Sequence, residues 1–193
     1  MITQIKGRLV EKNPAYIVLD CNGVGYLLRI SLNTYSKISD SEICMLYTYL
    51  SIKEDSHTLF GFMEKTEREL FTSLISVSGV GPNTAQMILS SLSPEQAHRA
   101  IMNSNVSALQ SVKGIGGKTA QRIILDLKDK LAKKDIQINN SFSQHNTTRE
   151  EALTALTMLG FAKKSIEQAV DKELSSESNV DVEELVKRVL KKM

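Results

Sequence analysis

Two short turns in the middle of the chain have the residue types of a phosphate-binding backbone. Residues 79–81 are Gly-Val-Gly, and residues 114–116 are Gly-Ile-Gly. A turn that passes close to a sugar-phosphate chain needs residues without a Cβ. The N–H groups at the start of the following helix then bind phosphate oxygens, with help from the helix dipole. Since such contacts do not reach base edges, the turns indicate DNA binding that is largely independent of sequence.

The two turns belong to an internal repeat. Residues 79–88 align without gaps with residues 114–123, and Gly, Gly, Thr, Ala, Gln and Ile coincide. One Gly-x-Gly between helices is often only a tight turn, but two copies with matching flanks predict a duplicated helix-hairpin-helix. The candidate DNA-binding residues are Gly79, Val80, Gly81, Asn83, Thr84, Gly114, Ile115, Gly116, Gly117, Lys118, Thr119 and Arg122.

Apolar and basic residues have separate tasks in this arrangement. Val80 and Ile115 are expected to anchor the hairpins in a helical core, while Lys118 and Arg122 add charge-assisted phosphate contacts. The net charge of the chain is only +2, but residues 63–135 contain 10 Lys or Arg against 7 Asp or Glu. Such a local excess can bind phosphate, although alone it is equally typical of a solvated helix face.

A nucleotide-binding loop is a poor alternative for the second turn. Gly117, Lys118 and Thr119 resemble the end of a P-loop, but Val112 stands where the P-loop needs its first glycine. The dinucleotide pattern fails as well, because Thr119 occupies the place of its third glycine. We therefore expect no ATP binding. No other cofactor is expected, and no metal, because the sequence offers no persuasive constellation of acidic, His or Cys ligands.

The elements around the turns divide the chain into an α+β multidomain arrangement. The first third is rich in β-forming residues separated by turn signals, which suits a small Greek-key barrel of the OB type. Its aromatic residues could stack on bases, but β propensity explains them better. The expected strands are 2–10, 16–19, 24–30, 43–52 and 58–62, and the aromatic residues are Tyr16, Tyr26, Tyr47, Tyr49 and Phe60.

Helical spacing follows the barrel. Ser93 with Gln96 and Asn105 are expected helix caps, and residues 148–151 (Thr-Arg-Glu-Glu) form a capping box that should start a helix. Between them lies a polar, Asn- and Ser-rich stretch without periodicity, which is typical of a flexible linker. The expected helices are 67–77, 82–91, one from 93, 105–110, 118–133, 148–160, 162–174 and 181–190. The expected domains are the barrel 1–62, the all-α tandem helix-hairpin-helix domain 63–135, the linker 136–147 and a three-helix module 148–193.

Composition excludes several classes of protein. No apolar run approaches the length of a membrane span, and the first residues have no pattern of a secretory signal. Two cysteines, Cys21 and Cys44, are expected to be reduced in a cytoplasmic protein.

The order of domains and three motifs resemble the RuvA family, the junction-recognition subunits of the bacterial branch-migration machine. The motifs are residues 53–62, the hairpin 79–82, and residues 114–116 followed by Lys118-Thr119-Ala120. The resemblance covers the whole chain, although the linker and last module match in type and order more than in residues.

This resemblance implies a bacterial cytoplasmic protein that binds four-way (Holliday) junctions as a homotetramer. It is compatible with either one or two tetramers on each junction. Glu54 and Asp55 would form an acidic pair at the tetramer centre that repels phosphates at the crossover. From the sequence alone, the same pair would be a solvated hairpin turn. Residues 148–193 would bind the AAA+ ATPase RuvB, and a RuvC-type resolvase would be a further partner. The chain itself would be non-catalytic.

Two positions depart from the family pattern. Many relatives have Lys where this chain has Asn83, and another Lys where it has Gly117. Two phosphate-contacting charges per subunit are thereby lost, which predicts a shallower salt dependence of DNA binding than in a more basic relative.

Other classes of function are less well supported. A nuclease or glycosylase would need a nucleophile or metal constellation, and the three histidines, His57, His98 and His145, are scattered. A general duplex or single-strand binder built on the barrel would show no preference for junctions.

Overall fold

The computed structural model describes residues 1–39, 42–140, 144–176 and 180–192. The chain divides into two compact units, Met1–Ala132 and Lys133–Met193. The predicted fold class is confirmed: a closed barrel is followed by a helical hairpin domain and then by a three-helix module.

The first unit begins with a five-stranded barrel. Its strands are β1 (Gln4–Asn13), β2 (Tyr16–Cys21), β3 (Val24–Ile30), β4 (Ile43–Ile52) and β5 (His57–Phe62). They close in the order β1-β2-β3-β5-β4, with β3 and β5 parallel and the other pairs antiparallel. One short helix between β3 and β4, α1 (Leu32–Lys37), was not predicted, because six residues are too few to show a helical period.

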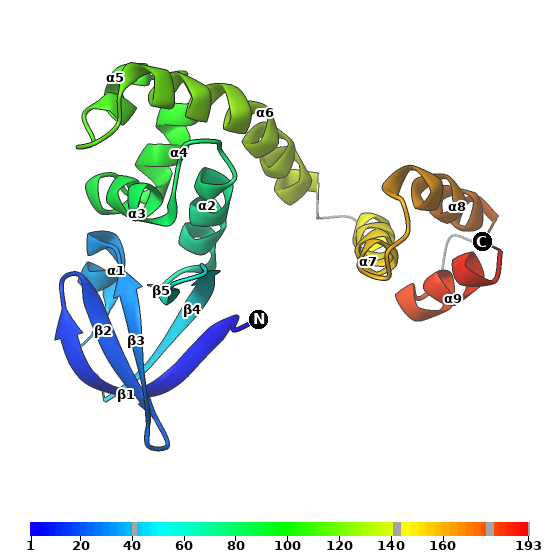
Figure 1. Cartoon of the computed structure of the whole chain (residues 1–193). Helices are drawn as coiled ribbons and strands as arrows, with labels where there is room; N and C mark the ends of the chain where they lie inside the picture. The colour runs from blue at the N-terminus through cyan, green and yellow to red at the C-terminus, as the bar shows by residue number, and fades with distance from the viewer. Residues whose placement is uncertain (40–41, 141–143, 177–179, 193) are drawn as a thin grey trace. The chain divides into compact units, whose positions relative to one another are not determined.

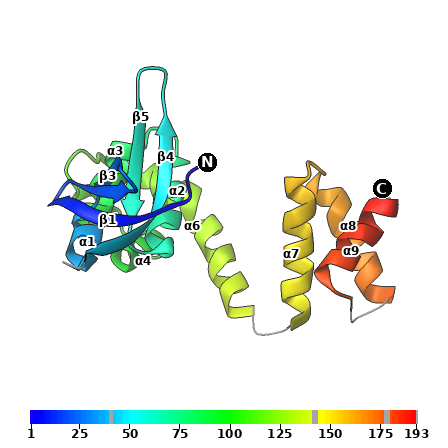
Figure 2. The same cartoon turned by 90° about the horizontal axis from the view of Figure 1, so that it is seen from below.

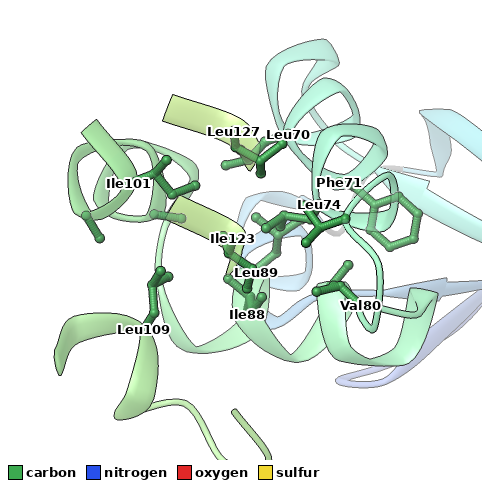
Figure 3. Close-up of a cluster of buried hydrophobic side chains, with 14 of the residues drawn as sticks. Leu70, Phe71, Leu74, Val80, Ile88, Leu89, Ile101, Leu109, Ile123 and Leu127 are labelled. Atoms are coloured by element: carbon green, nitrogen blue, oxygen red, sulfur yellow. The ribbon is translucent and has the colours of Figure 1, made fainter. Parts of the chain in front are cut away.

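The helices α2 (Lys65–Ile75), α3 (Pro82–Ser91), α4 (Pro94–Met102), α5 (Val106–Gln110) and α6 (Gly117–Asn140) follow. Figure 1 shows α2 and α3 above one end of the barrel, and Figure 3 shows the buried apolar side chains on which these helices pack. Both predicted caps are confirmed: Ser93 and Gln96 form a capping box at α4, and Asn105 caps α5.

Strand β5 contributes to the helical core as well as to the barrel. Phe60 and Phe62 are each 2% exposed, and their rings lie 5.1 Å and 4.9 Å from the ring of Phe71 on α2, centre to centre. The barrel and helices are therefore joined by packing, and Phe60 is not available to stack on a base.

A buried carboxylate joins the same two parts. Glu67 of α2 is fully buried and accepts hydrogen bonds from the hydroxyls of Ser31 and Thr34, at the start of α1. Thr34 Oγ1 also accepts a hydrogen bond from the backbone N–H of Met63, at 3.3 Å. Burial raises the pKa of Glu67, and the two hydroxyl donors only partly oppose that rise.

This buried carboxylate predicts a pH-dependent stability difference. A folded-state pKa above the unfolded value gives stability that is fully present below the unfolded pKa and is lost as pH rises through the folded pKa. The free energy of unfolding of the wild type relative to Glu67→Gln should therefore fall as pH rises from below about 4.3 toward neutrality. The fall is about 1.4 kcal/mol for each unit by which the two pKa values differ.

Urea titrations followed by tyrosine fluorescence can measure this, because all five tyrosines lie in residues 16–49 and the chain has no Trp. Subtracting the Glu67→Gln curve removes the titration of every other carboxyl group. A wild-type minus variant difference that is constant with pH would contradict the assignment.

In the second unit, α7 (Gln144–Met158), α8 (Lys163–Ser176) and α9 (Val182–Lys192) pack side by side as a three-helix module (Figure 2). Arg149 Nη2 donates to Asp171 Oδ2 at 3.0 Å, and a second bond from Nε completes a bidentate pair that joins α7 to α8. The pair keeps the pKa of Asp171 below its usual value. The core residues are Ala152, Leu156, Ile166, Val170, Val180, Leu185 and Val189.

Two boundaries around the predicted linker need correction. Helix α6 continues to Asn140 and α7 begins at Gln144, so both helices reach into residues 136–147. The capping box predicted to start a helix at Thr148 therefore lies inside α7. Residues 136–147 contain no Gly or Pro, which are the residues that usually end helices. Residues 141–143 lie outside the described part of the chain, and flexibility of the linker stays a prediction.

None of the helices over the described ranges is long and apolar enough to cross a membrane. Both cysteines are free thiols, as expected; Cys44 is buried, which raises its pKa, and Cys21 is half-buried.

Candidate nucleic-acid interface

The two hairpin turns are closed by the same backbone hydrogen bond. In the first, the N–H of Val80 donates to the carbonyl of Val77 at 3.0 Å. In the second, the N–H of Ile115 donates to the carbonyl of Val112 at 3.1 Å. The helices that follow also begin alike, since Ala85 and Ala120 each donate at 3.0 Å to the carbonyl 4 residues earlier. The repeat seen in the sequence is thus a repeat in structure.

The first glycine of each hairpin is required by the backbone. Gly79 has φ +89° and Gly114 has φ +90°, a left-handed conformation that strains any residue with a Cβ. The second glycine is different. Gly81 has φ −87° and ψ 170°, which any residue adopts, and Gly116 is also outside the left-handed region.

Apart from the glycine itself and its two neighbours in the chain, no atom of the described residues lies within 4 Å of a Cβ built on Gly81 or Gly116. Neither backbone conformation nor packing within the chain therefore explains these two glycines. Their open surroundings are the arrangement expected where another molecule's backbone must approach closely.

The N-terminus of α3 also has open hydrogen-bond donors. Its N-cap is Gly81, which has no side chain to form a cap. Glu64 makes no side-chain cap at α2 either, whereas the hydroxyls or amide of Ser31, Ser93 and Asn105 cap α1, α4 and α5. Gly116, directly before α6, likewise has no side chain that could serve as a cap. The first-turn N–H groups of α3 and α6 can therefore bind an anion.

The apolar residue between the glycines holds each hairpin in place, as predicted. Val80 is 5% exposed and Ile115 is 6% exposed, and both belong to the core of the helical domain, where Figure 3 shows Val80 beside Phe71 and Leu74.

The two hairpins also share a surface. A depression of about 360 Å³ is lined by the first hairpin turn, through Ser78 and Gly79, and by the first turns of α6. The α6 residues that line it are Lys118, Thr119, Gln121 and Arg122. Lys118 and Arg122 are exposed there, so their cationic groups lie beside the turn of the other hairpin.

Comparison with known proteins agrees with this geometry. The chain matches three family models, described as the RuvA N terminal domain over residues 1–61, the SAM-like helix-hairpin-helix tandem over 71–129, and the RuvA C-terminal domain over 147–193. A protein of Christiangramia forsetii is 53% identical over 193 residues, which is 100% of both chains. The chain belongs to the RuvA family.

Further relatives cover the chain to the same extent. A protein of Flavobacterium psychrophilum is 50% identical over 100% of both chains, and one of Cytophaga hutchinsonii is 48% identical over 99% of both. All three relatives are named "Holliday junction branch migration complex subunit RuvA".

The acidic pair that the RuvA resemblance singled out lies at the tip of the β4–β5 hairpin. The backbone N–H of Lys53 donates to the carbonyl of Ser56 at 2.8 Å, which closes a tight turn around Glu54 and Asp55. Both carboxylates are exposed, and Figure 2 shows this hairpin projecting beyond the other strands of the barrel.

The two positions that depart from the RuvA pattern lie early in α3 and α6, at neighbouring places in the repeat, where Asn83 corresponds to Lys118 and Gly117 to Pro82. Asn83 is exposed, and its Oδ1 accepts a hydrogen bond from Arg29 Nη1 at 2.9 Å. A Cβ built on Gly117 would lie 2.9 Å from Gln110 Nε2, the end of a flexible exposed side chain. Arg29 was not among the predicted site residues, because nothing in a strand sequence indicates a contact with a helix 54 residues later.

Within the described residues, no three His, Cys, Asp or Glu side chains gather as ligands for a metal ion. His57 is exposed at the start of β5.

Proposed function

We propose that this chain binds four-way DNA junctions through the sugar-phosphate backbone and independently of base sequence. The observation that carries the proposal is the pair of equivalent hairpins, each leading into a helix that is directly preceded by a glycine with open surroundings and no side chain to form a cap. Backbone N–H groups of this kind recognise phosphates but not bases. The names of the full-length relatives support the junction as the DNA form that is bound.

The same proposal assigns the other parts of the chain. Four copies form a homotetramer that holds the junction open, with Glu54 and Asp55 near its centre. Residues 148–193 bind a RuvB-type AAA+ ATPase, which hydrolyses ATP, while this chain is a non-catalytic subunit. The alternative is a general duplex or single-strand DNA-binding module, which the projecting acidic pair and the relatives' names do not favour.

A competition titration tests this function. Labelled four-way junction is titrated with the full chain at two salt concentrations, against unlabelled junction, duplex of the same sequence and single-stranded DNA. Strong preference for the junction supports the proposal, and affinity should decrease as salt rises because bound phosphates release counterions. Equal competition by duplex would reject the junction-specific role and leave the hairpins as general DNA contacts.

The acidic pair should affect selectivity more than affinity. In Glu54→Gln, Asp55→Asn, loss of repulsion should strengthen duplex binding more than junction binding and lower the junction-to-duplex preference by about 10-fold. Two exposed charges at about 0.2–1 kcal/mol each give about 2- to 30-fold, and the expected value lies within that range. Competition titrations of this double variant and of its control variant measure the junction-to-duplex preference directly.

Glu150→Gln, Glu151→Gln is the matched control, because it neutralises an adjacent, exposed acidic pair in the second unit. Its preference should equal that of the wild type. An unchanged preference in the Glu54, Asp55 variant would mean that this pair is only a solvated turn.

A further inference from the structure

The first hairpin has no basic residue of its own. No Lys or Arg occurs from residue 69 to residue 98, a range that holds the end of α2, the hairpin and all of α3. The second hairpin has Lys118 and Arg122 in the first turns of its helix. Two backbone sites of equal geometry thus differ in the charge that their own sequences provide.

Arg29 of β3 brings a guanidinium group to the first hairpin. Its Nη1 donates to Oδ1 of Asn83, the second residue of α3, at 2.9 Å. Its Cζ lies 5.7 Å from the centre of the Phe60 ring, which gives a cation–π contact. The strand alternation exposes Arg29 while Leu28 and Ile30 are buried, so the guanidinium group remains accessible to a ligand.

The position of Arg29 relative to α3 is fixed by two neighbouring contacts. The carbonyl of Ile30 accepts from Gln86 Nε2 at 2.6 Å, and the N–H of Leu32 donates to Ser90 Oγ at 3.2 Å. Positions 83, 86 and 90 are spaced by three and four residues and so lie on one face of α3. The end of β3 is therefore attached along that face, which reduces the entropy lost when Arg29 binds a ligand.

We propose that Arg29 binds a DNA backbone phosphate beside the N-terminus of α3 and so provides, from the barrel, a positive charge that the first hairpin's own sequence lacks. Guanidinium has five N–H donors in a planar fork that matches a phosphate, and Asn83 accepts from one of them. The inference rests on the proposed DNA-binding function, and it adds a residue of β3 to the site.

Salt titrations of junction binding by the full chain test this inference. In Arg29→Gln, the slope of log Kobs against log salt concentration should become shallower by about 0.9 for each Arg29 that contacts phosphate. Arg8→Gln is the control, because it removes one exposed arginine charge from the barrel at a side chain that pairs with Asp20 instead. Its slope should equal that of the wild type. An Arg29→Gln slope equal to that of Arg8→Gln would overturn the proposal.

Two more variants separate the charge of Arg29 from its contact with the helix. Asn83→Ala removes the hydrogen-bond acceptor but keeps the guanidinium, so the salt slope should stay at the wild-type value. Arg29→Gln, Asn83→Lys places a cation on the neighbouring side chain and should restore the slope. A shallower slope in Asn83→Ala, or no recovery in the double variant, would indicate that Arg29 is only a structural contact and would overturn the proposal.

Failure of this inference can be distinguished from failure of the proposed function. If the wild type does not prefer junctions over duplex, the proposed junction function fails, whatever Arg29 does. If the wild type prefers junctions and Arg29→Gln keeps the wild-type slope, only the assignment of Arg29 fails.

Discussion

A Gly81→Ser, Gly116→Ser double variant should fold as stably as the wild type and lose most of its affinity for four-way junctions. Both glycines precede the first turn of a hairpin helix, outside the left-handed region and with no atom of the described chain near a built Cβ. Serine is a preferred N-cap, so helix stability should be kept or slightly raised. The new hydroxyl accepts a bond from the N–H groups that phosphate would otherwise bind, and the new Cβ obstructs the approach of the DNA backbone.

The expected loss is large because hydrogen bonds to charged groups contribute about 1.5–3 kcal/mol each. Loss of one such bond weakens binding by about 10- to 150-fold, and the two hairpins together should lose at least about 100-fold. Junction titrations measure the affinity, and urea titrations followed by tyrosine fluorescence measure the stability. Wild-type affinity in the double variant would reject both hairpins as phosphate-binding sites.

Gly79→Ala is the control for a glycine that the backbone conformation requires, and Gly25→Ala is the control for a glycine at a position that tolerates a side chain. Gly79 has φ +89°, so its variant should lose about 1–2 kcal/mol of stability from backbone strain. Gly25 is exposed on β3, and its built Cβ only reaches ordinary contact with Val18 at 3.6 Å. Gly25→Ala should change neither stability nor binding appreciably, while Gly81→Ser should change binding alone.

These glycines show why the hairpins could be predicted from the sequence. Glycine is the residue that backbone strain or close approach demands, so its spacing reports geometry directly. The repeat also includes residues before the first glycine, since Leu74 and Val77 correspond to Leu109 and Val112 at the same offset. Helix caps were predictable for the same reason, as Ser93 with Gln96 shows: the signal and the bond lie within one turn.

Features that depend on distant contacts could not be predicted. Arg29 has the alternation of an ordinary exposed strand residue, and its partner Asn83 is known only once β3 lies against α3. Glu67 resembles a solvated charge early in a helix, yet it is fully buried against α1. Helix ends in residues 136–147 were missed because polar composition favours a linker while no Gly or Pro stops α6 before Asn140.

The Arg29 contact also changes the expected salt dependence. The sequence predicts two missing phosphate charges per subunit, at Asn83 and Gly117. If Arg29 replaces the charge at Asn83, only the position of Gly117 remains without one. The salt slope should then lie between that of a relative with both lysines and the slope of Arg29→Gln.

Removing the three-helix module of α7, α8 and α9 should abolish stimulation of the RuvB-type ATPase and leave junction binding within about 3-fold of the wild type. The second unit has a core of its own from α7, α8 and α9, and the proposed hairpin sites lie entirely in the first. Since α7 begins at Gln144, the deletion should remove residues 144–193, because a cut at 148 would leave the first turn of α7 behind. Junction titrations and junction-stimulated ATP hydrolysis by the cognate motor measure the two properties separately.

A core substitution in the full-length chain distinguishes a folded module from a mere tether. Leu156 is fully buried among α7, α8 and α9, and Leu→Ala at such a site costs about 2–5 kcal/mol. A unit of this size has little stability to lose, so Leu156→Ala should unfold it while the chain keeps its length. Loss of motor stimulation with intact junction binding in this variant would mean that the motor binds the folded three-helix surface. If the variant stimulates normally although circular dichroism shows the second unit unfolded, the motor must bind an unfolded segment or a different part of the chain.

Loss of junction binding in the deletion of residues 144–193 would instead place part of the DNA site in the second unit and contradict the division of tasks.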